Sequence, residues 1–264
     1  MKLPPAAWRK RSGLPRLLRA LGAAEGATRF VGGCVRDTLV GIEVSDIDLA
    51  TRHRPEQVIA RLEAAGVKAV PTGIAHGTVT AVVNGQPAEV TTLRRDVATD
   101  GRRATIAYTE DWREDAARRD FTINALSADP VSGEVFDYFG GIADLESRRV
   151  RFIGDPLTRI AEDHLRILRF FRFHAGYGGE VADEAALAAC AARANDLMGL
   201  SRERIADELL KLLGLADPAA TVGLMVEHGI LRPVLPEVAG AGRLAALVEA
   251  ERRAGIAAEP VRRL

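Results

Sequence analysis

The sequence changes its pattern near residue 150, and this change restricts the possible folds more than any other feature. Before it, short runs rich in β-branched residues alternate with helical runs, and each is bounded by Gly, Asn or Pro. After Arg151 only helical periodicity remains. We therefore expect an α+β chain, in which a small mixed sheet is followed by an all-helical part.

The pattern also predicts individual elements. Strands are expected at 28–31, 46–50, 78–83 and 87–92, and helices at 55–65, 183–195, 201–213 and 219–228. Asn84-Gly85, between two of these strands, predicts a hairpin because both residues tolerate a positive φ. Ser201 is expected to cap one helix, and Gly229 to end another.

The composition excludes several classes of protein. Among 264 residues, 36 Lys and Arg balance 36 Asp and Glu, and 47% of the chain is apolar. That argues against disorder and against binding nucleic acid by bulk charge, although a local basic groove stays open. Cys34 and Cys190 are too few for a disulfide framework. Without the pattern of a membrane span or signal peptide, we expect a soluble cytoplasmic protein with no membrane partner.

A Gly-Gly turn follows the first predicted strand, in residues 31–37 (VGGCVRD). Adjacent glycines let backbone N–H groups approach an anion, and a helix N-terminus adds partial positive charge. Arg36 can bind a phosphate through two parallel hydrogen bonds. The turn therefore predicts phosphate binding, with a plain structural turn as the alternative.

Two acids enter the second predicted strand as Asp46-Ile47-Asp48. Residues two apart on a strand point to one face with Cα atoms about 6.5–7 Å apart, so both carboxylates can converge on hard cations. Such paired metals would activate an attacking hydroxyl and shield a leaving pyrophosphate. Glu89, which alternates with apolar residues on the strand expected to pair with 78–83 in the hairpin, is a candidate third catalytic carboxylate. The alternative for these acids is a solvated strand surface.

Arginines gather in two further places in the first half. Arg118 and Arg119 precede a short apolar helix that contains Asn124, which suits contact with a triphosphate or sugar. A solvated helix start is the alternative. The segment 94–111 is also rich in arginine and has few apolar anchors, so we expect a mobile basic loop.

A fourth charged block occupies residues 162–172. Its members recur every three residues and are Asp163, Arg166, Arg169 and Arg172. On one helix they would be neighbours, and could present hydrogen-bond donors and acceptors to the edge of a nucleobase. A helix salt bridge between Asp163 and Arg166, worth about 0.2–0.5 kcal/mol, is the alternative.

Together, in this order, these blocks resemble the tRNA nucleotidyltransferase and bacterial poly(A) polymerase family of the DNA polymerase β superfamily, most of all its class II CCA-adding enzymes. The similar motifs are the phosphate and metal motif at 32–48, the ribose-side motif at 118–126, the hinge segment at 137–145 and the nucleobase-recognising EDxxR at 162–166. The resemblance covers about 28–175, and 201–213 more loosely.

The resemblance implies a role for each matching residue. Asp46 and Asp48 would hold two Mg²⁺ ions. The residues implied to contact the incoming nucleotide are Gly33, Arg36, Arg119, Asp163, Arg166, Arg169 and Arg172. Among these, Arg119 would lie on the sugar and phosphate side, whereas Asp163 and Arg166 would select CTP or ATP by base-like hydrogen bonds.

The implied activity is template-independent addition of C, C and A to the 3′ end of tRNA, with CTP and ATP as substrates and release of pyrophosphate. Poly(A) polymerases share the first three motifs, and CC-only enzymes have a shortened loop in place of 94–111. The strand-like run His76-Gly77-Thr78-Val79-Thr80 and the apparent completeness of 94–111 favour CCA addition. A non-catalytic RNA-binding module is disfavoured, because Asp46 and Asp48 are both present.

The resemblance also implies a domain order. A palm-like nucleotidyltransferase head is expected at 26–150 and a helical neck with a nucleobase-recognising helix at 151–215. Residues 216–264 would begin a helical body. Family members usually continue through a body and a tail, so we expect either a truncated chain or a short member of the family.

Overall fold

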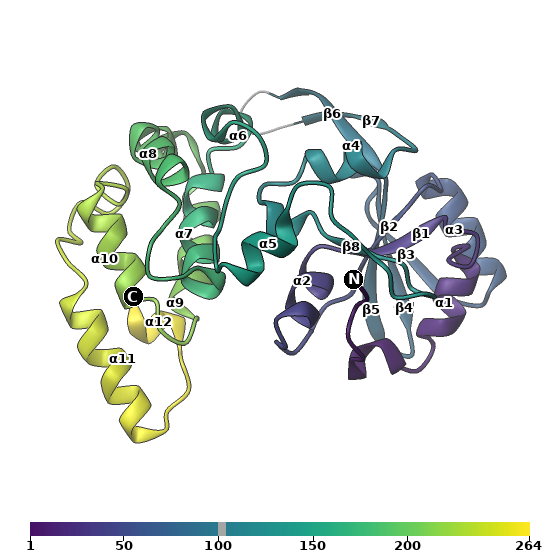
Figure 1. The fold of residues 1–264 in the computed structure, drawn as a ribbon, viewed down its shortest axis with the longest axis horizontal. Coiled ribbons are helices and arrows are strands. Elements are labelled where there is room, and N and C mark those ends of the chain that lie inside the picture. The colour runs from purple at the N-terminus through teal and green to yellow at the C-terminus, as the bar shows by residue number, and fades with distance from the viewer. Residues whose placement is uncertain (100–103) are drawn as a thin grey trace. The chain divides into compact units, whose positions relative to one another are not determined.

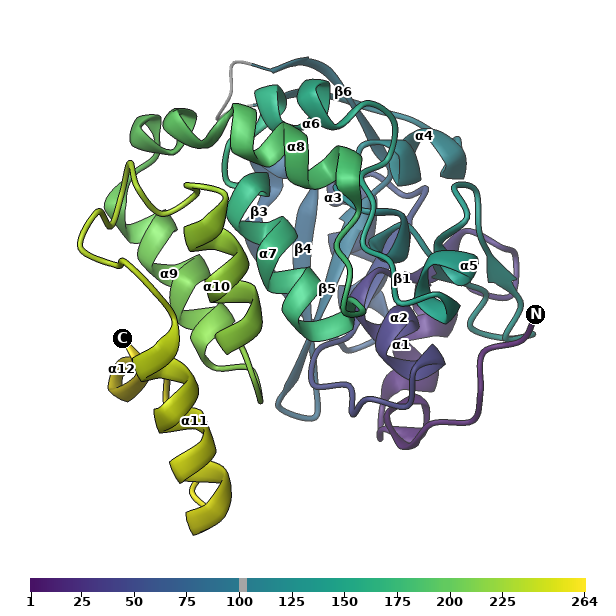
Figure 2. The same cartoon turned by 60° about the vertical axis from the view of Figure 1, so that its left-hand side comes forward.

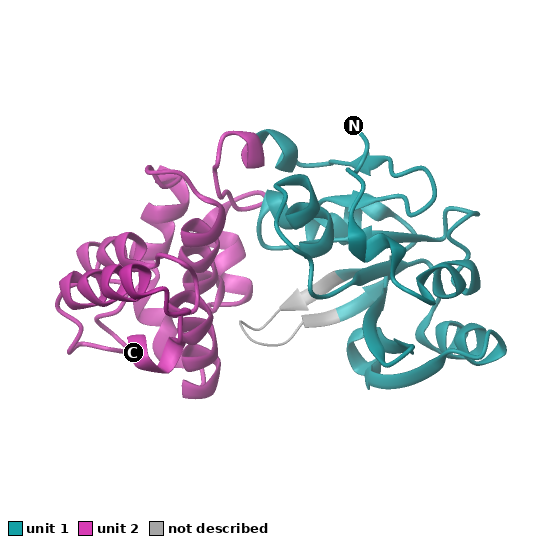
Figure 3. Cartoon of the chain, turned by 90° about the horizontal axis from the view of Figure 1, so that it is seen from below, with its two compact units in different colours: residues 1–98, 105–143 teal, residues 99–104, 144–264 magenta. Residues whose placement is uncertain are grey.

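In the computed structural model, residues 1–99 and 104–264 are described. The chain divides into two compact units, shown in different colours in Figure 3. The first, here called the head unit, contains residues 1–98 and 105–143; the second, the helical unit, contains residues 99–104 and 144–264. The seven-stranded sheet with its short helices lies in the head unit, and from residue 144 on the regular elements are all helices, so the α+β fold class is confirmed.

The head unit is built on a seven-stranded sheet with the order β3-β4-β5-β2-β1-β8-β9. The strands are β1 (Thr28–Val31), β2 (Asp48–Thr51), β3 (Lys68–Gly73), β4 (Thr78–Val83), β5 (Gln86–Thr92), β8 (Ser127–Ala128) and β9 (Val135–Phe136). All neighbouring pairs in this sheet are antiparallel except β2 and β5, which run parallel. The predicted hairpin joins β4 to β5, with φ of 50° at Asn84 and 77° at Gly85.

Short helices surround this sheet (Figure 1). They are η1 (Ala7–Lys10), α1 (Leu14–Ala20), α2 (Gly33–Leu39), α3 (Pro55–Ala64), η2 (Ile74–His76), α4 (Trp112–Ala117), η3 (Thr122–Asn124) and α5 (Gly141–Glu146). Figure 1 shows α1 and α3 on one side of the sheet and α2 on the other. Helix α3 begins with Pro55 and buries Val58 and Leu62, as its apolar spacing predicts.

Two features of the head unit differ from the sequence prediction. The segment expected as an irregular loop contains strands β6 (Arg94–Thr99) and β7 (Ala104–Tyr108), which form a separate two-stranded sheet. Their β-branched and aromatic residues favour strands, although arginines obscure the pattern. Strand β3 was not predicted because it contains Pro71, which a strand tolerates at a sheet edge, where β3 lies. Arg102 and Arg103 lie outside the described residues.

The helical unit packs its helices around a phenylalanine-rich core. Its helices are α6 (Pro156–Glu162), α7 (Arg166–Tyr177), α8 (Glu184–Ala192), η4 (Ala194–Gly199), α9 (Arg202–Leu213), α10 (Ala219–Glu227), α11 (Gly242–Ala254) and α12 (Pro260–Arg263). Helix α7 packs against α9 and α10, and the three lie side by side in Figure 2. Phe170 and Phe171 of α7 are fully buried. Ser201 caps α9, and Gly229 with φ of 70° follows α10, both as predicted.

The fourth charged block does not form one continuous helix, so that expectation is wrong. Helix α6 ends at Glu162 and α7 begins at Arg166, while Asp163 is extended, with φ of −154° and ψ of 108°. The Asp163 carboxylate accepts a hydrogen bond from the N–H of Leu165 at 3.1 Å. Aspartate readily bonds to backbone N–H groups near it, which favours a helix break over a helix interior. Asp163 therefore does not share a helix face with the three arginines.

Across the described parts of the chain, no helix combines the length and the apolar character needed to cross a membrane.

A close backbone approach at Gly141 yields a test of the head-unit packing. A Cβ atom at Gly141 would lie 2.3 Å from the carbonyl oxygen of Thr122, in the segment that carries the arginine motif. Gly141→Ala should therefore lower the free energy of unfolding by about 1–3 kcal/mol, measured by urea denaturation. Gly240→Ala is the matched control, because a Cβ there meets nothing within 4 Å. Equal stability of the two variants would contradict the packing.

Candidate active site

The Gly-Gly turn connects β1 to α2, as the sequence predicts. Gly32 has a φ of 66°, which favours glycine, and a Cβ atom there would lie 3.0 Å from Nη1 of Arg119. Gly33 is the first residue of α2. A single turn of chain thus brings two separately predicted motifs, the glycines and the arginine pair, into contact.

Arg36 projects from α2 into a buried hydrogen-bond network. Only 7% of Arg36 is exposed, and its guanidinium donates to the side-chain oxygen of Asn124 and, at 2.8 Å, to Asp37. Asn124 in turn donates to Asp120 at 2.9 Å. Because each of these groups is held by a partner, the orientation of Arg36 is fixed by the ribose-side motif of residues 118–126.

Two of the three predicted acids face each other on the parallel pair of strands, and the third lies just before β2. Asp48 begins β2 and lies directly opposite Glu89 of β5 in the ladder, so both side chains point to the same face. Asp46 is exposed and lies outside the strand, before Ile47, which is buried. The prediction that Asp46 and Asp48 share a strand is thus wrong in detail, although Asp46 remains close enough to act electrostatically on Asp48.

The charges at this site act strongly on Asp48. Burial raises the pKa of Asp48 to about 6, with further rises from Glu89 and Asp46, while Arg119 and Arg36 oppose the shift. Asp48 is half-buried whereas Glu89 and Asp46 are exposed, and like-charged carboxylates this close repel one another and favour a bound cation. All of these groups lie in the head unit. The sequence thus predicted five charged residues that the fold brings together.

The donor set fits a divalent cation that is completed by a ligand. Within residues 1–99 and 104–264, no group of three or more His, Cys, Asp or Glu could hold a metal by itself. Mg²⁺ is usually held by one or two carboxylates together with water and substrate phosphates rather than by a cage of protein ligands. The mutual repulsion at Asp48 and the nearby arginines are consistent with this kind of open site.

The helical unit holds its predicted residues with ion pairs. Asp163 accepts two hydrogen bonds from Nη2 of Arg204, at 3.0 and 2.9 Å, and Arg204 lies in the first turn of α9. Arg166 pairs with Glu162, in the preceding helix. The salt bridges of this block are therefore Asp163 with Arg204 and Arg166 with Glu162, which differs from the local pairing considered from spacing.

The remaining two arginines lie farther along α7. Arg172 pairs with Glu208, of which only 3% is exposed, and its guanidinium carbon lies 4.3 Å from the ring centroid of Phe173. The guanidinium carbon of Arg169 lies 5.3 Å from the same centroid. Sequence reasoning missed Arg204 and Glu208. Their spacing of four residues at the start of α9 was the available signal, because it places both on one helix face.

Family comparisons agree with this division of the chain. Residues 28–151 match the family described as Poly A polymerase head domain, and residues 183–241 match the one described as probable RNA and SrmB-binding site of polymerase A. The two matches together cover more than half of the chain.

Individual relatives point the same way. The chain is 44% identical over 207 residues to the mitochondrial CCA tRNA nucleotidyltransferase 1 of Mus musculus, covering 76% of this chain and 47% of that protein. It is 42% identical over 186 residues to the CCA-adding enzyme of Levilactobacillus brevis, covering 70% and 45%. The chain therefore spans about half the length of the curated relatives it matches.

A solved structure has the same fold. The crystal structure of the Bacillus stearothermophilus CCA-adding enzyme in complex with CTP matches with a TM-score of 0.76 and 33% identity, covering 91% of this chain and 58% of that one. Fold and sequence thus define a polymerase-type nucleotidyltransferase head followed by helices. The chain belongs to the tRNA nucleotidyltransferase and poly(A) polymerase family, in the class II branch of the CCA-adding enzymes. The resemblance found in the motifs is confirmed.

The buried pair between Arg172 and Glu208 should matter more to stability than an exposed pair on the same helix. Glu208→Gln should lower the free energy of unfolding by about 1–3 kcal/mol, because it leaves Arg172 without its charged partner. The control is Asp207→Asn, since Asp207 pairs with Lys211 at the surface and should change stability by less than about 0.5 kcal/mol. Urea unfolding measures both. An equal loss from the two variants would contradict the structural role of Glu208.

Proposed function

We propose that this chain catalyses template-independent addition of C, C and A to the 3′ end of tRNA, with CTP and ATP as substrates and pyrophosphate as a product. The observation that supports it best is the parallel pairing of β2 with β5. That pairing sets Asp48 opposite Glu89. Arg119 lies close enough to Asp48 for the positive charge of Arg119 to act on the Asp48 carboxylate. Names of relatives, which include CCA-adding enzymes from bacteria and mitochondria, support the choice of product.

Mg²⁺ is the proposed cofactor, with Asp46 and Asp48 as its ligands and Glu89 as an additional catalytic carboxylate. When bound, Mg²⁺ would lower the pKa of the attacking 3′-hydroxyl and neutralise charge on the leaving pyrophosphate. The protein would contribute the carboxylate oxygens of Asp46 and Asp48, and carboxylate oxygens are the ligands that Mg²⁺ prefers.

The Gly-Gly turn and the arginines are proposed to hold the incoming nucleotide. Gly33 would let backbone N–H groups approach a phosphate, and the guanidinium groups of Arg36 and Arg119 would bind phosphate and sugar oxygens. Because Arg36 and Arg119 are already held by Asn124, they would need little reordering when nucleotide binds. Such fixed positioning of the α-phosphate relative to the 3′-hydroxyl of the RNA is a major source of rate enhancement.

The helical unit is proposed to select the base. Asp163 and Arg166 would offer a carboxylate acceptor and guanidinium donors to the edge of cytosine or adenine, while Arg169 and Arg172 would complete the nucleotide pocket. The ion pairs from α9 and Glu162 support this proposal, because they hold two of these side chains in single orientations. The domain limits proposed for these roles are a head at 26–150, a neck at 151–215 and the start of a body at 216–264.

Three alternative functions predict different products from CTP and ATP. A poly(A) polymerase would use ATP alone, a CC-only enzyme would stop after two additions, and an RNA-binding module would add nothing. CCA addition is favoured because the strands β6 and β7 are both present between β5 and α4. A cytoplasmic location is part of this proposal, although the matched relatives from Mus musculus, Homo sapiens and Danio rerio are mitochondrial.

The first test uses a tRNA transcript that lacks CCA. Incubated with CTP, ATP and Mg²⁺, the protein should extend it by three nucleotides, and a chelator such as EDTA should abolish extension; denaturing gels resolve each product. ATP alone should add no long tail. A poly(A) tail from ATP alone, or a product that stops after C and C in the mixture, would overturn the proposed product.

The second test concerns the metal ligands. Asp46→Ala should reduce the rate of nucleotide incorporation at least about a hundredfold, because transition-state charge would lose its counter-ion. Glu43→Ala is the matched control, since Glu43 is an exposed acid in the same segment before β2. Full activity of Asp46→Ala would remove this residue from the metal site.

The third test concerns base selection. Asp163→Ala should increase misincorporation of UTP and GTP relative to CTP and ATP more than it reduces the rate with CTP, because an acceptor for the base edge is lost. Asp196→Ala serves as control, since Asp196 is another acid of the helical unit and pairs with Arg193. Unchanged selectivity of Asp163→Ala would leave Asp163 only its structural pairing with Arg204.

A further inference from the structure

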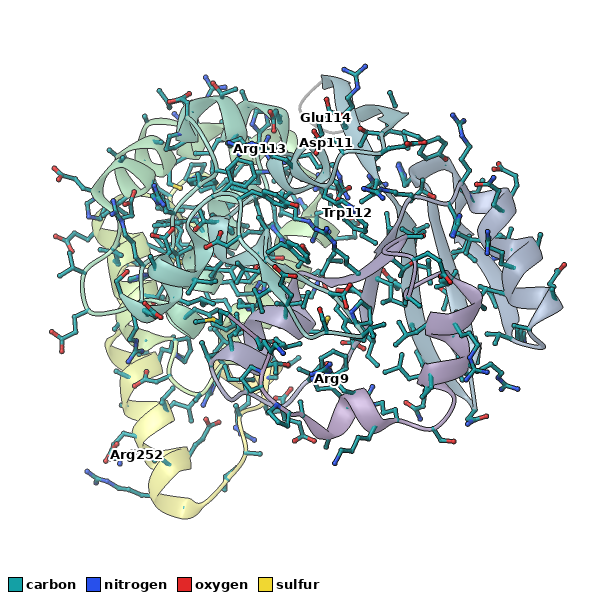
Figure 4. All side chains as sticks on the ribbon, turned by 45° about the vertical axis from the view of Figure 1, so that its right-hand side comes forward. Arg9, Asp111, Trp112, Arg113, Glu114 and Arg252 are labelled. Carbon is teal, nitrogen blue, oxygen red and sulfur yellow. The ribbon has the colours of Figure 1, made fainter. Side chains whose placement is uncertain are left out.

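Helix α4 carries an acid on its buried face. Its buried residues are Trp112, Asp115 and Ala116, a spacing of three and four residues that defines one side of the helix. Figure 4 shows Trp112 on the inner side of α4, with Asp111 and Glu114 farther out. Only 3% of Asp115 is exposed. A carboxylate in this environment requires charged or hydrogen-bonded partners.

Asp115 has three such partners, and each comes from a region near the candidate site. One carboxylate oxygen accepts from the backbone N–H of Arg94, the first residue of β6, at 3.2 Å, and from Nε of Arg118 at 2.9 Å. The other oxygen accepts from Nη2 of Arg119 at 3.4 Å. Asp115 therefore links the start of β6, the end of α4 and the arginine proposed to bind nucleotide.

The other end of the Arg119 guanidinium is also fixed. Its Nη1 donates to the carbonyl oxygen of Asn124 at 3.4 Å and lies where a Cβ of Gly32 would almost touch it. Asp115 and the carbonyl oxygen of Asn124 thus hold this guanidinium from two sides. Although burial alone would raise the pKa of Asp115, Arg119 and Arg118 hold it below its usual value, so the carboxylate stays charged at neutral pH.

Helix α4, which carries Asp115, is packed against the sheet through Trp112. Trp112, one turn earlier on α4, packs in a buried cluster with Val31 and Ala50, and the guanidinium carbon of Arg29 lies 4.2 Å from the centroid of its ring. This cluster fixes α4 against the strands that carry the candidate metal ligands. The backbone of α4 at Asp115 is thus held against the sheet.

We propose that Asp115 is a positioning residue for nucleotide binding, which sets the orientation of the Arg119 guanidinium toward the phosphates and sugar of the incoming nucleotide. This inference rests on the proposed function of Arg119 and goes beyond it, because Asp115 makes no contact with the nucleotide in this role. Asp115 acts on Arg119 through its charge and its hydrogen bond. The hydrogen bond from the N–H of Arg94 ties the Asp115 carboxylate to the start of β6.

The test is a double-mutant cycle between Asp115 and Arg119. Asp115→Asn keeps the shape and one acceptor oxygen but removes the negative charge. We expect it to raise the Kd for CTP, measured by equilibrium titration with Mg²⁺, and the KM for CTP by roughly tenfold, with a smaller change in the KM for tRNA. In an Arg119→Ala background the same change should have no further effect. Asp115→Glu, which retains the charge, should bind CTP more tightly than Asp115→Asn.

A control separates positioning from helix stability. Asp111→Ala removes the side chain that caps α4 by accepting from the N–H of Arg113 at 2.7 Å, and it does not alter Asp115. Asp111→Ala should lower the unfolding temperature and leave the Kd for CTP unchanged. Additive effects of Asp115→Asn and Arg119→Ala, or an equal rise in Kd from Asp111→Ala, would overturn the inference. A wild-type protein that bound no CTP would instead overturn the proposed function itself.

Discussion

The parallel pairing of β2 with β5 is the interaction on which the candidate site depends. It places Asp48 opposite Glu89, and two acids directly opposite each other in a ladder are destabilising unless something compensates their charge. The protein supplies part of that compensation from Arg36 and Arg119, which lower the pKa that burial raises. The remaining negative charge is what a divalent cation would neutralise. The repulsion between Asp48 and Glu89 therefore both lowers the local stability of the sheet and favours the proposed binding of a metal ion.

The arginines can take part in this balance only because other groups hold them. Arg36 is buried and bonded to Asn124, and Arg119 is held between Asp115 and the carbonyl oxygen of Asn124. In the helical unit, α9 supplies the partners of Asp163 and Arg172 in the same way. In each unit, residues outside the motifs thus help to hold the residues proposed to meet a nucleotide: Asp115 in the head unit, and Arg204 and Glu208 in the helical unit.

Local chemistry predicted much of the fold, whereas tertiary pairing did not follow from it. The hairpin at Asn84-Gly85 and the cap at Ser201 depend on neighbouring residues alone, so the sequence predicts them correctly. The register that sets Asp48 against Glu89 joins distant segments, and spacing within either strand cannot reveal it. Asp163 was placed on a helix because its spacing fits one, but an Asp side chain can bond to the backbone and end the helix instead.

The most direct test of this account is the stability of Glu89→Gln with and without metal. In EDTA, removing one of the two opposed charges should raise the free energy of unfolding by about 0.2–1 kcal/mol relative to wild type. Adding Mg²⁺ with CTP should then stabilise wild type more than the variant, because only wild type retains the full carboxylate set. Urea denaturation measures both. A variant that is less stable than wild type in EDTA and gains equally from Mg²⁺ with CTP would contradict the account.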